Sequence, residues 1–102
     1  MNIYKVTRTD NVDCDNFDSF VCYAESEDAA RVMNPDRDTA VVKDGKWVVD
    51  LFGKMIVRIR WAWIKASELH TLKVELLGVS DTETEPKFIL ASFKAGSDEP
   101  TH

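Results

Sequence analysis

Two stretches near the start of the chain alternate apolar or β-branched residues with polar ones. Residues 2–9 and residues 17–23 both follow the two-residue period of a half-buried strand. The Asx-rich residues 10–16 between them favour a loop, because Asp and Asn side chains stabilise turns. We therefore predict an antiparallel hairpin in which Phe20 and Cys22 share one face of the second strand.

A short helix is predicted directly after this hairpin. Ser26 supplies the hydroxyl of a typical N-cap, and Glu27 and Asp28 place negative charge in the first turn, where it complements the helix dipole. Asn34 and Pro35 end the helix, which is marginal on its own and is therefore expected to dock on the sheet. The side chains expected to dock are Ala29, Ala30, Val32 and Met33.

The middle of the chain predicts a second hairpin and a long strand. Asp44 and Gly45 separate residues 39–43 from residues 46–49, and this dipeptide favours a type I′ turn because both of its residues need a positive φ. Residues 54–64 follow with a strict two-residue period. One face of this strand carries Met55, Val57, Ile59, Trp61 and Trp63, and the other carries Ile56, Arg58, Arg60, Ala62 and Ile64. We expect the tryptophans to face the core and the arginines to face solvent or a partner.

The remaining segments complete the predicted fold. They are a turn or one helical turn at residues 65–69, a strand over residues 71–77 that ends at Gly78, a loop over residues 80–86 and a final strand over residues 87–93. The whole pattern predicts an α+β fold: an antiparallel, twisted sheet of about five or six strands with one short helix packed on it. Residues 1–94 are expected to form a single compact α+β domain, and residues 95–102 a flexible C-terminal tail.

Composition agrees with one small domain, since 44% of the 102 residues are hydrophobic and the net charge is −5. The charge is uneven: residues 1–42 hold 4 basic and 9 acidic side chains, residues 43–73 hold 7 and 3, and residues 74–102 hold 2 and 6. An acidic chain is repelled by phosphate backbones, so the sequence disfavours nucleic acid and favours a protein partner. With no long apolar run and no secretory pattern, we expect no membrane contact and a cytoplasmic location.

Four aspartates within nine residues form a conspicuous acidic cluster: Asp10, Asp13, Asp15 and Asp18. Carboxylates can bind a hard cation, but a calcium loop that begins at Asp13 needs a glycine and a glutamate where this chain has Asp18 and Ala24. We therefore expect no metal and interpret the cluster as a solvated loop that contacts a protein partner. Further candidate contacts, in the loop before the last strand, are Asp81, Glu83 and Glu85.

A basic strip on the predicted long strand is the alternative binding site. Lys54, Arg58 and Arg60 suit nucleic acid or a phosphorylated ligand, although the tryptophans that would stack on bases lie on the opposite face. The sequence has few candidate catalytic residues. His70 and His102 are the only histidines, and no nucleophile–base spacing or glycine-rich phosphate loop occurs. The two cysteines are expected to be free thiols. We therefore expect a protein that is not an enzyme and binds no cofactor.

Several short motifs resemble a group of small acidic proteins encoded by bacteriophages and prophages. That group has an opening of the form RTD…YDEFDSFVV…EEAR…P and a close of the form ILASFNAG. The matching segments here are residues 8–10, 15–21, 27–31, Pro35, 74–78 and 89–96. The chain departs from the pattern between Trp47 and Trp63. The resemblance implies a setting, an accessory phage protein made inside a bacterium, and brings no established activity with it.

Small accessory phage proteins often bind and block a host factor, including defence systems such as CRISPR effectors, and the resemblance implies such a role here. We therefore expect a non-catalytic protein that blocks a bacterial host protein in the host cytoplasm, in the manner of an anti-defence inhibitor. Its acidic loops would occupy a basic surface of that protein. The alternative is a nucleic-acid or nucleotide-binding module that uses the strand with Arg58 and Arg60.

Overall fold

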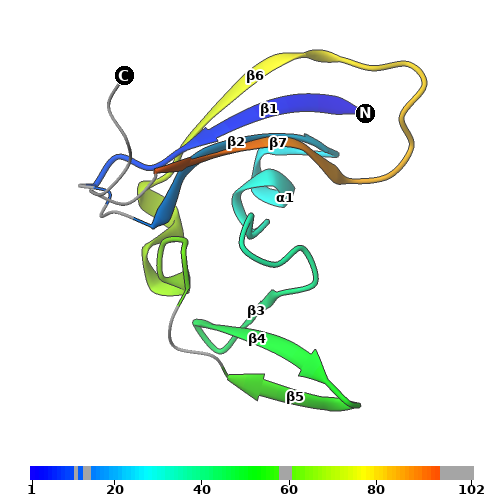
Figure 1. Ribbon diagram of the computed structural model, residues 1–102. Coiled ribbons are helices and arrows are strands. Elements are labelled where there is room, and N and C mark those ends of the chain that lie inside the picture. The colour runs from blue at the N-terminus through cyan, green and yellow to red at the C-terminus, as the bar shows by residue number, and fades with distance from the viewer. Residues whose placement is uncertain (11, 13–14, 58–60, 95–102) are drawn as a thin grey trace, which may run out of the picture.

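The computed structural model describes residues 1–10, 12, 15–57 and 61–94, which form two antiparallel sheets and two short helices (Figure 1). The strands are β1 (Asn2–Thr7), β2 (Asn16–Ala24), β3 (Val41–Lys43), β4 (Lys46–Leu51), β5 (Lys54–Val57), β6 (Lys73–Val79) and β7 (Lys87–Lys94), and the helices are α1 (Glu27–Arg31) and the 3₁₀-helix η1 (Ala66–Thr71). The larger sheet has the order β6-β1-β2-β7 and the smaller β3-β4-β5. The predicted α+β class is confirmed, but the prediction of one sheet with five or six strands is wrong, because the strands divide between two sheets.

The predicted first hairpin is confirmed by the antiparallel pairing of β1 with β2. The register places Asn2 opposite Ala24, and Phe20 and Cys22, which were predicted to share one face, are both buried. The last two strands flank this hairpin, because β6 pairs with β1 and β7 pairs with β2. Segments from both ends of the chain therefore build the larger sheet (Figure 1).

Helix α1 begins at the predicted N-cap, where Ser26 Oγ accepts a hydrogen bond from the amide of Ala29 at 3.1 Å. The docking side chains are Ala29, Ala30 and Met33. The prediction that Val32 also docks is wrong, since this side chain is 47% exposed. The helix ends at Arg31, so Val32 is the C-cap residue that follows the last helical turn.

Two tight turns build the smaller sheet. The predicted turn at Asp44 and Gly45 joins β3 to β4, and φ values of 54° and 73° confirm the left-handed conformation of a type I′ turn. Phe52 and Gly53 form a second turn of this kind between β4 and β5, with φ values of 54° and 80°. This second turn was not predicted, because a phenylalanine rarely adopts a positive φ and only the glycine marks it.

The predicted long strand over residues 54–64 is wrong. β5 ends at Val57, and Trp63 and Ile64 lie outside any strand. The prediction put these two neighbours on opposite faces with only Trp63 in the core, but both are buried, whereas Met55 and Val57 on the predicted core face are half exposed. Arg58, Ile59 and Arg60 lie outside the described residues, so their predicted faces are not tested.

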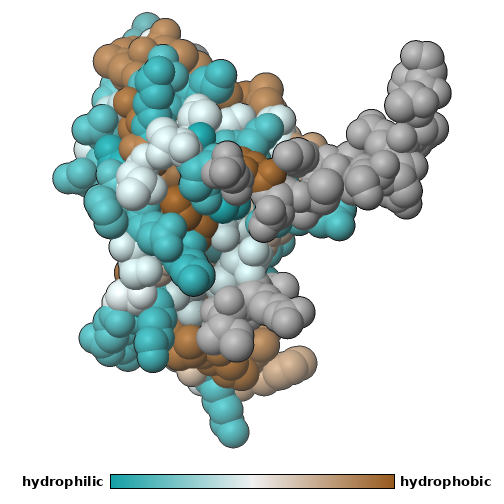
Figure 2. Space-filling view, turned by 90° about the vertical axis from the view of Figure 1, so that its left-hand side faces the viewer, coloured by the Kyte–Doolittle hydropathy of each residue, from teal (hydrophilic) through white to brown (hydrophobic). Residues whose placement is uncertain are grey.

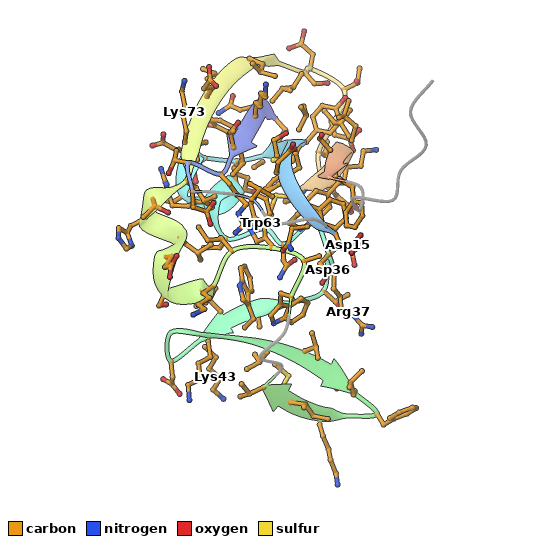
Figure 3. The ribbon with its side chains drawn as sticks, turned by 60° about the vertical axis from the view of Figure 1, so that its left-hand side comes forward. Asp15, Asp36, Arg37, Lys43, Trp63 and Lys73 are labelled. Atoms are coloured by element: carbon orange, nitrogen blue, oxygen red, sulfur yellow. The ribbon has the colours of Figure 1, made fainter. Side chains whose placement is uncertain are left out.

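The hydrophobic core connects the two sheets. Phe20 of the larger sheet packs edge-on against Trp63 and Phe88, with ring centroids 5.3 and 5.1 Å apart. The buried indole of Trp47, in the smaller sheet, donates a hydrogen bond from Nε1 to the carbonyl oxygen of Ile64 at 2.9 Å. Figure 3 shows Trp63 between the two sheets. Trp63 and Ile64 therefore fill the space between the sheets.

The last part of the chain follows the prediction closely. The predicted helical turn is η1, and β6 continues through Gly78 to Val79 instead of ending at the glycine. The predicted tail, residues 95–102, lies outside the described residues. Within the described part of the chain, neither helix has the length and hydropathy of a membrane-crossing helix.

Replacing Gly45 by valine should lower the free energy of unfolding by about 1–2 kcal/mol, the usual steric penalty of a side chain in the left-handed region. An added Cβ meets no atom within 4 Å, so the penalty comes from the backbone conformation, with φ at 73°. Urea unfolding midpoints measure the loss, and Lys46→Ala at the exposed neighbour is the control. Equal midpoints for the two variants would show that the assignment of a type I′ turn to this hairpin is wrong.

Candidate binding surface

The acidic side chains of the first loop are partly paired within the chain. Arg8 donates two hydrogen bonds to the carboxylate of Asp10, from Nε at 2.9 Å and from Nη2 at 2.6 Å, and lowers the pKa of that carboxyl. Asp18 accepts a hydrogen bond at 3.1 Å from the hydroxyl of the following serine. Asp15 is exposed and has a φ of 63°, and Asp13 lies outside the described residues.

The second acidic loop lies at the opposite end of the larger sheet (Figure 1). β6 runs antiparallel to β1 from Lys73, which is opposite Thr7 beside the first loop, to Val79, where the second loop begins. In this loop Glu83 lies 2.9 Å from the ammonium of Lys87, and this hydrogen bond raises the pKa of Lys87. The two exposed carboxylates are Asp81 and Glu85. The two groups of predicted acidic contacts therefore do not form one surface.

Exposed apolar side chains gather on the smaller sheet. Met55, Ile56 and Val57 are consecutive residues of β5 and are each between 42% and 52% exposed, and Phe52 in the preceding turn is fully exposed. Lys54, a predicted site residue, is also exposed at the start of this strand. Figure 2 shows hydrophobic surface beside hydrophilic residues at the lower end of the molecule, where this sheet lies. Contiguous exposed apolar surface of this kind is typical of binding sites.

A cavity of about 420 Å³ lies on the core-facing side of the smaller sheet. Its apolar walls come from Trp47, Trp61 and Val57, and its basic side chains are Lys46 and Lys65. The two tryptophan rings are 6.2 Å apart, so both contribute to the same wall. We call this space the core-side cavity; its size lies within the range of ligand sites. Gly45, Ala66 and Ser67 complete its lining.

A second cavity, of about 310 Å³, opens on the outer face of the same sheet. This outer cavity is lined by Lys43, Asp44, Lys46, Val48, Met55 and Val57. The register explains the apolar part of this lining, because Val48 of β4 is directly opposite Val57 of β5. Figure 3 shows Lys43 on this sheet. The smaller sheet therefore has a cavity near each of its faces, and Lys46 and Val57 contribute to both cavities; from β5, Met55 and Val57 line them.

The basic part of this surface differs from the predicted one. Of the predicted residues, Lys54 lies on β5, whereas Arg58 and Arg60 lie outside the described residues. The lysines that line the cavities, Lys43, Lys46 and Lys65, were not predicted as site residues. Two of them flank the turn at residues 44–45, and this turn was the available signal in the sequence.

Cys22 is the free cysteine of the described residues, and it is buried. Burial raises the pKa of its thiol to about 11, so the reactive thiolate is scarce at neutral pH. No group of three or more His, Cys, Asp or Glu side chains in the described ranges is arranged to hold a metal ion.

Comparisons with known proteins give no match to this chain: no protein-family model, no curated protein and no solved structure is similar to it. Function is therefore inferred from the charges, the cavities and the exposed strand of the chain itself.

Proposed function

We propose that this chain is a non-catalytic binding protein that captures an extended segment of a bacterial host protein at the edge of β5 and thereby blocks that protein. One observation carries the proposal: β5 is a sheet edge whose exposed apolar side chains include two, Met55 and Val57, that line a cavity. Extended peptides bind such edges as an added strand, where backbone hydrogen bonds supply affinity and side-chain pockets supply specificity.

β5 differs from the other edge strands in the regularity of its pairing. The pairing of β6 with β1 and that of β7 with β2 both contain register shifts, and β3 has only three residues. Irregular and short edges are the means by which proteins avoid pairing with other chains. β5, in contrast, pairs with β4 in uninterrupted register over all four of its residues. β6 also pairs without a shift over four residues, Lys73 to Leu76, so what distinguishes β5 among the described edge strands is that its exposed apolar residues Met55 and Val57 line a cavity.

The resemblance to phage-encoded accessory proteins supports a bacterial host protein as the partner and the host cytoplasm as the location. Blocking of this kind needs a stable fold and an exposed edge, and it needs no reacting group. The acidic loops lie at the two ends of the larger sheet (Figure 1), and Asp10 of the first loop lines a cavity together with Trp61 and Lys65. Their contact with a basic host surface is therefore a separate prediction from capture at β5.

Val57→Glu should abolish capture of the host protein and leave the fold intact. Val57 lines both cavities and is 49% exposed, so the fold tolerates a carboxylate there while the docking surface gains a buried charge on binding. Tagged wild-type protein, Val57→Glu and the matched control Leu77→Glu are used to capture proteins from a bacterial lysate. Leu77 is 55% exposed and lies on β6, so the control makes the same change on another edge.

The proposal predicts a host protein that wild type and Leu77→Glu retain and that Val57→Glu loses by at least about tenfold, the effect of a charge in a desolvated interface. Mass spectrometry quantifies the captured proteins. If Val57→Glu retained every protein that the control retains, capture at β5 would be wrong.

A second candidate function is binding of a nucleotide in the core-side cavity. The observation that favours it is that Trp61 and Lys65 line one cavity together with Trp47 and Lys46, whereas the predicted long strand separated the tryptophans from basic residues. Aromatic rings stack on bases while lysines bind phosphate. Titration with ATP and with a short oligothymidylate, followed by tryptophan fluorescence, tests this function. Salt-sensitive binding that Lys65→Ala weakens would support it, and unchanged fluorescence would reject it.

A further inference from the structure

We infer that Phe52 is an anchor of the proposed complex, a side chain that fills an apolar pocket of the captured host protein next to β5. This inference rests on the proposed function, because it names a further contact with the same partner. Two properties of Phe52 support it: its backbone conformation, which opposes folding, and its full exposure, which leaves it without a packing gain.

Phe52 has a backbone conformation that its side chain disfavours. It is the first of the two central residues of the turn between β4 and β5, with φ at 54°, and Gly53 follows with φ at 80°. Left-handed backbone is costly for most residues with a Cβ, whereas Asn, Asp and Gly tolerate it. The turn between β3 and β4 has this preferred chemistry, because the residue with the same φ of 54° is Asp44. A phenylalanine therefore makes the β4–β5 hairpin less stable than an asparagine would.

The side chain of Phe52 gains no packing energy from the described part of the fold, since its relative exposure is 104%. Phe93 on β7 shows the usual situation: it is 49% exposed, and its ring centroid lies 5.0 Å from that of Phe17. Exposed apolar side chains are common, so exposure alone indicates nothing. A fully exposed side chain that also lowers the stability of its turn indicates a use outside the fold.

Phe52 lies next to the edge that the captured segment would join. β5 begins at Lys54, two residues after Phe52, and it is the last strand in the order of the described smaller sheet. A strand that adds to β5 therefore reaches the turn. Figure 1 shows this turn at the lower end of the molecule, away from the larger sheet. The apolar surface continues from Phe52 along the exposed side chains of β5, which are Met55, Ile56 and Val57.

The charges around the turn favour a protein pocket over an anionic membrane. Asp50 and Lys54, two residues before and two residues after Phe52, are both exposed and have opposite charges. Attachment to anionic lipid depends on clusters of basic residues, whereas here the two charges cancel. Protein interfaces combine aromatic side chains in partner pockets with a polar rim. Asp50 and Lys54 are suited to such a rim.

Phe52→Asn tests the inference with two independent measurements. It should raise the urea midpoint of unfolding by about 0.5 M, because asparagine tolerates the left-handed backbone and no packing is lost. It should also bind the host protein at least about tenfold more weakly, because the pocket is left unfilled. The host protein is the one that wild type captures from the lysate and Val57→Glu loses, and calorimetric titration measures its affinity. A loss of affinity in a stabilised variant cannot come from unfolding.

Phe93→Asn is the matched control, because it makes the same substitution at an exposed phenylalanine of the larger sheet. It should lower the urea midpoint, since it removes the ring contact with Phe17. Its affinity for the host protein should equal that of wild type. The two variants should therefore change stability in opposite directions, and only Phe52→Asn should change binding.

The outcomes separate the inference from the proposed function. Unchanged affinity of Phe52→Asn for a host protein that Val57→Glu loses would overturn the anchor and leave capture at β5 in place. If Val57→Glu lost no host protein, both would be overturned. A lower urea midpoint for Phe52→Asn would show that Phe52 supports the fold and would overturn the inference. Self-association in sedimentation velocity, or binding to phosphatidylglycerol vesicles, that Phe52→Asn abolishes would also overturn it, because a second copy or lipid would then contact Phe52.

Discussion

Trp47→Ala is expected to lower the free energy of unfolding by about 3–5 kcal/mol, the usual cost of truncating a buried aromatic side chain. Trp47 is 2% exposed, and its ring lies 6.2 Å from that of Trp61. Its Nε1 donates the hydrogen bond to the carbonyl oxygen of Ile64 at 2.9 Å. The truncation therefore opens a cavity between the two sheets and leaves a buried carbonyl without its donor. Such a loss is a large share of the total stability of a domain of this size.

Trp61→Ala is the matched control, because Trp61 makes contact with the same core but is only partly buried. Its truncation removes less apolar surface from the core and should cost less. Urea unfolding of both variants measures the difference, provided that the unfolding free energy depends on urea concentration with the same slope in both. If the two variants lost equal stability, the placement of Trp47 in the core and of Trp61 at its border would be wrong.

Arg31→Met should lower the free energy of unfolding by about 3 kcal/mol, the low end for the loss of two hydrogen bonds from a charged donor at about 1.5–3 kcal/mol each. Arg31 Nη1 donates to the carbonyl oxygens of Leu69 at 3.1 Å and Leu72 at 2.6 Å, and so connects α1 with the end of η1. Methionine retains the apolar stem but removes both of these hydrogen bonds, although the carbonyl of Leu69 still accepts from the amide of Leu72 at 3.1 Å. Thermal and urea unfolding both report the loss.

Glu27→Gln is the control for Arg31→Met. Glu27 is 57% exposed and lies 3.9 Å from Arg31 one helical turn away, and an exposed pair of this kind is worth about 0.3–0.5 kcal/mol. The control should therefore change stability by no more than this amount. If Glu27→Gln cost as much as Arg31→Met, the contribution of Arg31 would come from its ion pair and not from the two carbonyls.

Elements with a local chemical cause could be predicted from the sequence. Ser26 marks the start of α1 because its hydroxyl caps the helix, and Asp44 with Gly45 marks a type I′ turn because both residues tolerate a positive φ. Alternating side chains likewise predicted β1 and β2, whose pairing buries one face. Each of these signals lies within a few neighbouring residues.

Residues 54–64 show where such local signals fail. Their two-residue period is as regular as that of β1, yet residues 61–64 lie outside any strand. Contacts distant in sequence determine its path: the amide of Ala62 donates to the carboxylate of Asp36 at 3.0 Å, and the amide of Phe17 donates to the carbonyl of Ala62 at 2.8 Å. No local pattern predicts partners that are more than twenty residues away.

The candidate binding surface was predicted only in part for the same reason. Lys54 was recognised in the sequence, but Lys46 and Lys65 are brought to one cavity only by the turn before β4 and by the packing of η1 beside that strand. The acidic cluster was evident in the sequence, but its partial neutralisation by Arg8 and its separation from the second acidic loop depend on the folded sheet.

Hydrogen exchange of the backbone amides tests the central claim, capture of a partner segment at the edge of β5, most directly. The measurement compares the free protein with the protein in complex. The partner in this complex is the host protein that wild type captures from the lysate and Val57→Glu loses. We predict slower exchange in residues 54–57 when the partner is bound, because an added strand supplies hydrogen-bond acceptors to the amides at this edge. The amides of β6 and β7 should exchange at unchanged rates. Protection confined to the larger sheet or to the acidic loops, with unchanged exchange in β5, would contradict the account.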